Sequence, residues 1–297
     1  MLWLFFVAIV LIALYIDLGV LHKKVHAIKG KEAYIWSFFW IALSLVFNFF
    51  VYLTKGHESA LLFFTAYVVE KSLSIDNIFI FAIIFTYLNI PVKYQHKVLF
   101  YGVIGAFVMR MGFIFLGSYL ITHFEWLLYI FGLFLLFLAF QLLQKQKIYD
   151  PEKSWVIQIA RKVFPLTPEI DSGRFFVRKN KKTYITPLFL ALLLAEATDF
   201  IAALDSIPAV FVITTDPFLV YTSNIFALLG LRSLYFVVIH ALKKLRYLNM
   251  GLAGVLIFLS CKMLLSGFYT IPVLVSFSVV ALILGSAIFF SLKKKSH

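Results

Sequence analysis

Two short segments of this chain carry acidic residues with the same spacing inside stretches that are otherwise apolar. The first reads EKSLSIDN from Glu70 to Asn77, and the second reads DFIAALDS from Asp199 to Ser206. An ionised carboxylate at the centre of a bilayer costs about 2.5–3.5 kcal/mol on insertion scales. For a lone membrane acid a structural ion pair would be a serious alternative, but two matched clusters favour an ion pathway.

The residues around these acids predict a site for a hard divalent cation. We expect the metal ligands to be Glu70, Asp76, Glu196, Asp199 and Asp205. The expected supporting residues are Asn77, Ser74, Thr198, Ser206, Lys71, Arg110 and Arg232. With no His or Cys near the acids, every donor is an oxygen, which suits Mg²⁺, Ca²⁺ or Mn²⁺ better than Zn²⁺ or Cu⁺.

The formal charges of this set also fit a divalent ion. If all five acids and the three bases Lys71, Arg110 and Arg232 are ionised and face one cavity, two negative charges remain. One divalent cation would balance them. The simplest alternative for the two arginines is that they are counterions that fix the helix bundle.

The composition of the chain shows what must position these residues. Apolar residues make up 63% of the sequence and charged residues only 14%, far from the average of soluble domains. The apolar runs are continuous rather than alternating, which predicts spanning helices and not a barrel. We therefore expect an all-α polytopic membrane protein, that is, a single membrane domain over residues 1–297.

Runs long enough to cross a hydrocarbon core, which needs about 20 helical residues, predict nine transmembrane helices. They cover about residues 2–21, 34–53, 60–88, 97–121, 125–143, 184–214, 218–242, 247–266 and 270–292. Most of the 27 basic residues then fall in loops on one side. The positive-inside rule predicts an outer N-terminus and a cytoplasmic C-terminus.

The two acidic segments also indicate an internal repeat. Aligning Glu70 with Asp199 places Asp76 on Asp205 and Asn77 on Ser206. The segments would enter the bilayer from opposite sides, which predicts an inverted repeat of three helices, with the site near the midplane. The first repeat would cover residues 60–143 and the second 184–266, followed by a last helix at 270–292.

Helix periodicity raises a difficulty for this site. Glu70, Ser74 and Asn77 share one face, whereas Asp76 lies about 120° away on a regular helix. Pro208 removes a backbone donor, so we expect a kinked or unwound helix near Asp205, with a weaker break near Asp76.

The stretch 144–183 contains three prolines and scattered charges and reads as a cytoplasmic connector, with a short amphipathic helix around Trp155 to Val163. The net charge of +13 could suggest nucleic-acid binding, but the basic residues sit where membrane topology requires them. We expect the lipid bilayer and a divalent ion as partners and no nucleic acid or cofactor. The sequence has no HExxH motif and no serine–histidine arrangement typical of an enzyme.

Several motifs resemble the TerC family of integral membrane proteins. They are EKSLSIDNIF at 70–79, YQHKVLFYGVIGA at 94–106, AEATDFIAALDSIPAVF at 195–211 and TSNIFALLGLRSLYF at 222–236. The resemblance implies a bacterial inner-membrane protein related to the lysine-exporter superfamily, with links to tellurium resistance, manganese efflux and the response to alkaline pH. It assigns the family's acidic positions to the five predicted ligands and its basic positions to Arg110 and Arg232. Residues 200–204 depart from the usual pattern but alter no polar position.

Three functional hypotheses follow. The first is an exporter of divalent cations, Mn²⁺ above all, that works by alternating access and could be coupled to protons. The second is a transporter of another small solute, which Arg110 and Arg232 would grip. The third is a membrane partner protein for metal loading or secretion, which would bind metal without moving it.

Overall fold

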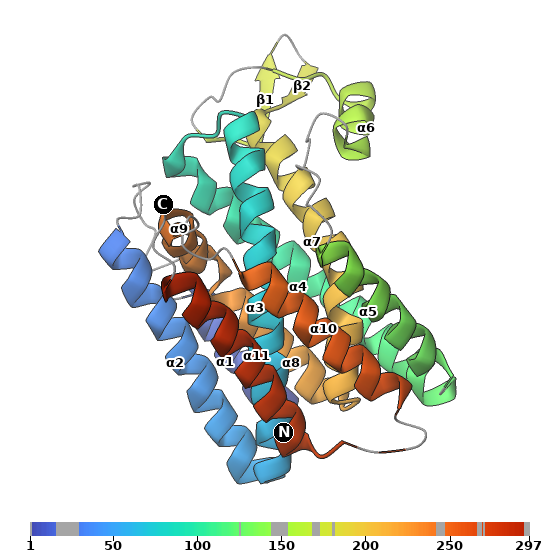
Figure 1. Ribbon diagram of the computed structural model, residues 1–297. Helices are drawn as coiled ribbons and strands as arrows, with labels where there is room; N and C mark the ends of the chain where they lie inside the picture. Colours follow the sequence, from blue (N-terminus) through green and yellow to red (C-terminus); the bar gives the residue numbers. More distant parts are fainter. Residues whose placement is uncertain are drawn as a thin grey trace.

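The computed structural model consists almost entirely of helices (Figure 1). It describes residues 2–15, 30–124, 126–143, 154–167, 173–179, 182–241, 247–265, 269 and 271–293. In chain order the elements are α1 (Leu2–Tyr15), α2 (Gly30–Lys55), α3 (His57–Tyr87), α4 (Val92–His123), α5 (Leu127–Leu143), α6 (Trp155–Val163), β1 (Phe176–Lys179), β2 (Lys182–Ile185), α7 (Pro187–Ile213), α8 (Pro217–Leu229), α9 (Leu231–Ala241), α10 (Leu248–Leu264) and α11 (Val273–Lys293). The all-α class is confirmed apart from one hairpin.

The lengths and composition of these helices are those of a membrane protein. Among the described residues, four helices are long and apolar enough to cross a bilayer: Glu32–Lys55, Val92–His123, Pro187–Ile213 and Val273–Ser291. A bent pair, Pro217–Leu229 with Leu231–Val237, would make a fifth span. Shorter apolar helices cover Leu2–Tyr15, Leu127–Gln141 and Met250–Leu264. Each predicted apolar run contains a helix, but the count of nine spans stays a prediction.

The expected unwinding of the acidic helices is wrong, whereas a kink at Pro208 stays a prediction. Helix α3 runs unbroken from His57 to Tyr87, and α7 continues through Pro208 to Ile213. A proline costs a helix one hydrogen bond, and membrane helices tolerate this when neighbouring groups satisfy the freed carbonyl. The break lies instead at Gly230, between α8 and α9, which bend by 42°.

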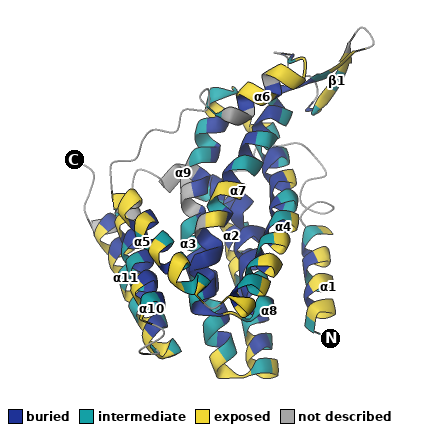
Figure 2. Ribbon diagram, turned by 90° about the vertical axis from the view of Figure 1, so that its right-hand side faces the viewer, coloured by how far each residue is buried: buried dark blue, intermediate teal, exposed yellow. Residues whose placement is uncertain are grey.

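Helix α3 lies at the centre of the packing, in contact with α2, α7, α8, α9 and α11. Helix α4 packs on α7 and α8, and α5 packs on α10. Figure 2 shows that buried residues are concentrated on the inner helices, whereas the outer faces of α1, α5 and α11 carry many exposed residues. Exposed apolar residues on the outer helices are what contact with lipid requires.

Small residues bring the third helices of the two predicted repeats close together. Gly132 of α5 packs against Met263 and Leu264 of α10. The hydroxyl of Ser260 donates a hydrogen bond of 2.6 Å to the Gly132 carbonyl. Lipid tails are as apolar as leucine, so close packing and interhelical hydrogen bonds must hold such helices together.

The connector forms the short helix α6, at the residues where the sequence predicts one, followed by an antiparallel hairpin that the sequence did not predict. The hairpin is held to the start of α4. The ammonium group of Lys97 donates a hydrogen bond of 2.7 Å to the carbonyl of Gly173 and lies over the ring of Phe175. Gly173 has a φ of +71° and packs on Tyr94, which together require glycine at this position.

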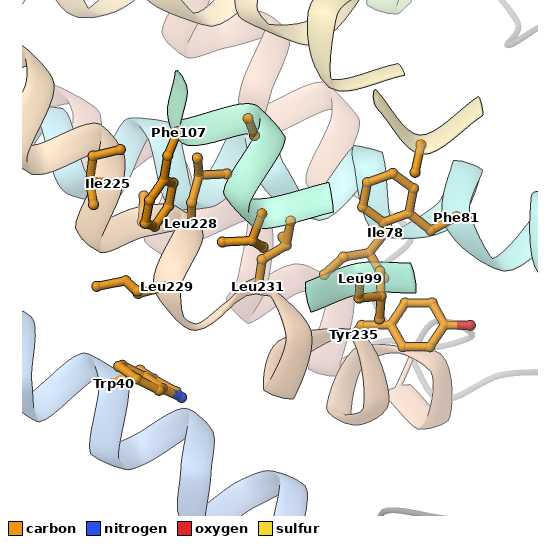
Figure 3. Close-up of a cluster of buried hydrophobic side chains, with 14 of the residues drawn as sticks. Trp40, Ile78, Phe81, Leu99, Phe107, Ile225, Leu228, Leu229, Leu231 and Tyr235 are labelled. Carbon is orange, nitrogen blue, oxygen red and sulfur yellow. The ribbon is translucent and has the colours of Figure 1, made fainter. Parts of the chain in front are cut away.

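A cluster of apolar side chains surrounds the break between α8 and α9 (Figure 3). The side chains labelled there come from α2, α3, α4, α8 and α9: Trp40, Ile78, Phe81, Leu99, Phe107, Ile225, Leu228, Leu229, Leu231 and Tyr235. Close packing on all sides fixes α3, α4 and α8 relative to one another. These three helices carry part of the candidate site, and α7 carries the rest.

Candidate metal site at the interface of the two halves

Glu70 is the centre of a buried polar network that joins the two halves of the chain. Its carboxylate oxygen Oε1 accepts a hydrogen bond from Nη1 of Arg110 on α4, with which it forms an ion pair. The same oxygen accepts a bond of 3.2 Å from the hydroxyl of Ser206 on α7. Nη1 of Arg110 also donates to Oδ1 of Asn224 on α8. Four helices therefore meet in one network, three of them at the Glu70 carboxylate and the fourth through Arg110.

The predicted polar face of α3 is confirmed. Glu70, Ser74 and Asn77 are all buried, as their spacing on a regular helix requires. The Ser74 hydroxyl donates back to the carbonyl of Glu70 at 2.8 Å. Asn77 points to α7, where its amide nitrogen lies 3.5 Å from Oδ1 of Asp199.

Asp199 connects this network to a second acid on α7. It is 2% exposed, and the charges of Arg110 and Glu70 both act on it. Its own charge acts on Glu196, which lies one turn earlier. Glu70, Arg110, Asp199 and Glu196 thus form a continuous set of interacting charges. The neighbouring Thr198 is buried, but its hydroxyl is used by the carbonyl of Leu194 at 2.8 Å.

The carboxylate of Glu196 lies directly against Gly105 of α4, where a methyl group would collide with it. We expect Gly105→Ala to push this carboxylate aside and to weaken Mn²⁺ binding by about tenfold, the lower end of the loss seen when groups supporting a metal site are changed. Titration of the purified protein with Mn²⁺ measures the effect.

Gly102→Ala on the same helix is the matched control, because a methyl group there meets no atom within 4 Å. Both changes gain the same helix propensity, so only the contact with Glu196 differs. Equal Mn²⁺ affinities for the two variants would mean that Glu196 does not contribute to the site.

Two of the three predicted membrane bases have other contacts. The Lys71 ammonium donates to the carbonyl of Ala227 at 2.9 Å, in the last turn of α8, where a cation is favoured by the helix dipole. The guanidinium of Arg232 lies over the ring of Phe100, 5.8 Å from its centroid. Arg110 is therefore the base whose described contacts include a predicted metal ligand.

The side chains of two predicted ligands, Asp76 and Asp205, lie outside what the structure describes. Among the side chains that it does describe, no three acids, histidines or cysteines are grouped as they would be around a metal ion. The complete ligand set therefore stays a prediction. Three of its five members, Glu70, Glu196 and Asp199, belong to the interacting charges on α3 and α7.

Sequence reasoning missed Asn224 and Gly105. Asn224 is fully buried and is the second partner of Arg110. A lone amide in the apolar run TSNIFALL is the signal that could have identified it, since buried amides in membrane helices usually bind another helix. Gly105 carried no comparable signal, because its role depends on how closely α4 approaches α7.

The fold and these buried charges define a multi-pass helical membrane protein with a polar network inside its bundle. Residues 55–297 match the integral membrane protein TerC family, so the chain belongs to this family, as its motifs had indicated. No solved structure is significantly similar to it.

Relatives extend over nearly the whole chain. "Uncharacterized membrane protein STKORF319" of Myxococcus xanthus is 48% identical over 297 residues, covering 100% of this chain and 93% of the relative. "Putative membrane-bound redox modulator Alx" of Escherichia coli (strain K12) is 45% identical over 294 residues, covering 94% and 90%. An uncharacterised membrane protein of Rickettsia bellii is 39% identical over 295 residues, covering 99% and 98%.

Proposed function

We propose that this protein exports a divalent cation, Mn²⁺ above all, by alternating access across a bacterial inner membrane. The observation that carries the proposal is the network joining Glu70 of α3 to Ser206 of α7 and, through Arg110, to Asn224 of α8. Intramembrane acids shared between two halves of a bundle are typical of ion pathways.

The packing of the helices supports two repeats related by a twofold axis. The first helix of the first repeat, α3, packs on the second helix of the other, α8. The reciprocal pair, α4 and α7, is also in contact, and the third helices, α5 and α10, pack on each other. If the two repeats exchanged places, the contact of α3 with α8 would become that of α7 with α4, and α5 and α10 would still pack on each other. Such symmetry is what rocking of one repeat against the other requires.

Proton coupling follows from the crowding of the acids. Glu196, Asp199 and Glu70 interact electrostatically, and like charges at close range disfavour simultaneous ionisation. A bound divalent ion would allow them to ionise together, and its release would favour protonation. Metal export and proton entry could then exchange at one site, with the N-terminus outside and the C-terminus in the cytoplasm.

Metal content of cells with and without this protein, grown in an excess of Mn²⁺, Mg²⁺ or Ca²⁺, tests the proposal. We expect the protein to lower cellular Mn²⁺ severalfold and to change the other two ions less. Unchanged content of all three ions, with the protein present in the membrane, would exclude export of these ions.

A second candidate is a membrane partner protein that binds metal for loading or secretion without moving it. It is favoured by the ion pair between Glu70 and Arg110, which already neutralises one predicted ligand. In vesicles of purified protein, this second candidate would show Mn²⁺ binding without flux.

The third candidate, transport of another small solute, would show as competition between that solute and Mn²⁺. Direct thiol–disulfide chemistry within one chain would need two thiols, and this sequence has the single cysteine Cys261.

A further inference from the structure

Arg110 has the largest fully buried side chain among the described residues. A single nitrogen, Nη1, donates to both Glu70 and Asn224. These partners come from the two halves of the chain, Glu70 from α3 and Asn224 from α8. The guanidinium therefore bridges the elements that must separate if the halves move against each other.

The charged groups around Arg110 are the acids expected to bind metal. Glu70 forms an ion pair with Arg110, and the charge of Arg110 also acts on Asp199 of α7. The charge of Asp199 acts in turn on Glu196. The positive charge of Arg110 thus acts directly on two predicted metal ligands, Glu70 and Asp199.

Several buried polar atoms around this guanidinium lack hydrogen-bond partners among the described groups. Oε2 of Glu70, Nε of Arg110 and Nδ2 of Asn224 are all buried, and none has a hydrogen-bond partner among the described groups. Buried polar atoms are nearly always paired in a folded protein. These three atoms, one on each member of the network, can therefore take further partners, such as a bound ion or water.

We propose that Arg110 is a tethered cation that occupies the metal site of the empty carrier and must leave Glu70 before a divalent ion can bind. This inference rests on the proposed function. A guanidinium and a divalent cation repel each other strongly at short range in a medium of low dielectric. The two cations would have to share the Glu70 carboxylate, and this repulsion favours displacement of the guanidinium when the metal ion binds.

The second partner of Arg110 provides the means of displacement. When the bond to Glu70 is broken, Nη1 can keep its bond to Asn224, and the guanidinium can turn about that contact. Either the guanidinium or the metal ion then always lies beside these acids, which avoids the cost of unpaired charges inside the bundle. Competition also lowers metal affinity, because the apparent dissociation constant rises as the fraction of metal-ready sites falls.

The alternative is that Arg110 is only a fixed strut between the helices. A strut and a competitor predict opposite effects on metal affinity. Loss of a strut would loosen the site and weaken Mn²⁺ binding, whereas loss of a competitor would strengthen it.

The test is titration with MnCl₂ of the full-length protein in lipid nanodiscs, comparing wild type with Arg110→Ala. If Arg110 holds the site for nine-tenths of the time or more, its removal should tighten Mn²⁺ binding by at least about tenfold. Millimolar guanidinium chloride should fill the space left in the variant and weaken Mn²⁺ binding again, competitively, with little effect on wild type. Sodium chloride at equal ionic strength controls for screening.

Lys55→Gln is the matched control variant. It also removes one positive charge from an ion pair, the one that Lys55 forms with Asp216 at the outer end of α8, away from the acids of the site. Its Mn²⁺ affinity should equal that of wild type.

Each outcome decides between the two accounts. Weaker or unchanged Mn²⁺ binding by a folded Arg110→Ala variant, or no effect of guanidinium on it, would overturn the inference while the proposed function stands. If neither protein binds Mn²⁺, the proposed function itself fails. Should the variant unfold without metal, its thermal unfolding is measured with MnCl₂: recovery supports displacement, and continued unfolding at saturating metal contradicts it.

Discussion

Asp199→Asn is expected to reduce Mn²⁺ efflux from loaded vesicles to the background of empty lipid, and Asp76→Asn and Asp205→Asn should do the same. The amide keeps the size of the side chain but removes the charge that a hard cation requires. Asp199 is buried between the α3 network and Glu196, so no solvent charge can replace it. Changes that only support a metal site cost about 10- to 100-fold in affinity, and the loss of a charged ligand should exceed that.

The matched control is Asp216→Asn. Asp216 caps α8 by accepting a hydrogen bond of 2.9 Å from the amide of Phe218, and asparagine caps helices equally well. The same chemical change is thus made at the N-terminus of α8, outside the candidate site. Near-normal efflux by Asp199→Asn, with the protein inserted in the vesicles, would show that this carboxylate is not a ligand.

Arg110→Gln should lower the free energy of unfolding in the absence of metal by about 3–5 kcal/mol, because it leaves a buried carboxylate without its charge partner. Glu70 and Arg110 have side chains that are each 1% exposed, so water cannot compensate. The double variant Glu70→Gln with Arg110→Gln should recover most of the loss, since two neutral amides replace the two charges. Unfolding of the detergent-solubilised protein by urea measures Arg110→Gln, Glu70→Gln and the double variant against wild type.

The ion pair between Lys55 and Asp216 provides a second cycle for comparison. Its side chains are 26% and 32% exposed, and exposed pairs contribute only about 0–1 kcal/mol. A coupling energy for Glu70 and Arg110 as small as that of the outer pair would contradict the view that the inner charges are cut off from water.

Periodicity in the sequence was sufficient to predict the buried face of α3. Glu70, Ser74 and Asn77 fall at helical spacing, and a continuous helix buries all three. The confirmed membrane class came from composition alone, because apolar content reflects the solvent and not the details of packing. The particular contacts of Arg110 with Glu70 and Asn224 could not be predicted, since they depend on how closely α4 approaches α3 and α8.

The position of the helix break illustrates the limit of local rules. Pro208 was expected to interrupt α7, yet the helix continues, and the bend occurs at Gly230. There the close approach of Trp40 and Lys71 leaves little room for a side chain, which no local pattern records. The positions of the Asp76 and Asp205 carboxylates, like the transported ion, stay predictions.

The pairing of α5 with α10 has a consequence for how the protein is made. Helix α5 leaves the ribosome before the connector and α7, α8 and α9, but its main contact is with α10. Until α10 is inserted, Gly132 and the neighbouring surface of α5 must face lipid or a chaperone of the insertion machinery. Packing of the helices therefore does not follow the order in which they are synthesised. The contact between α5 and α10 forms late, although α5 is inserted early.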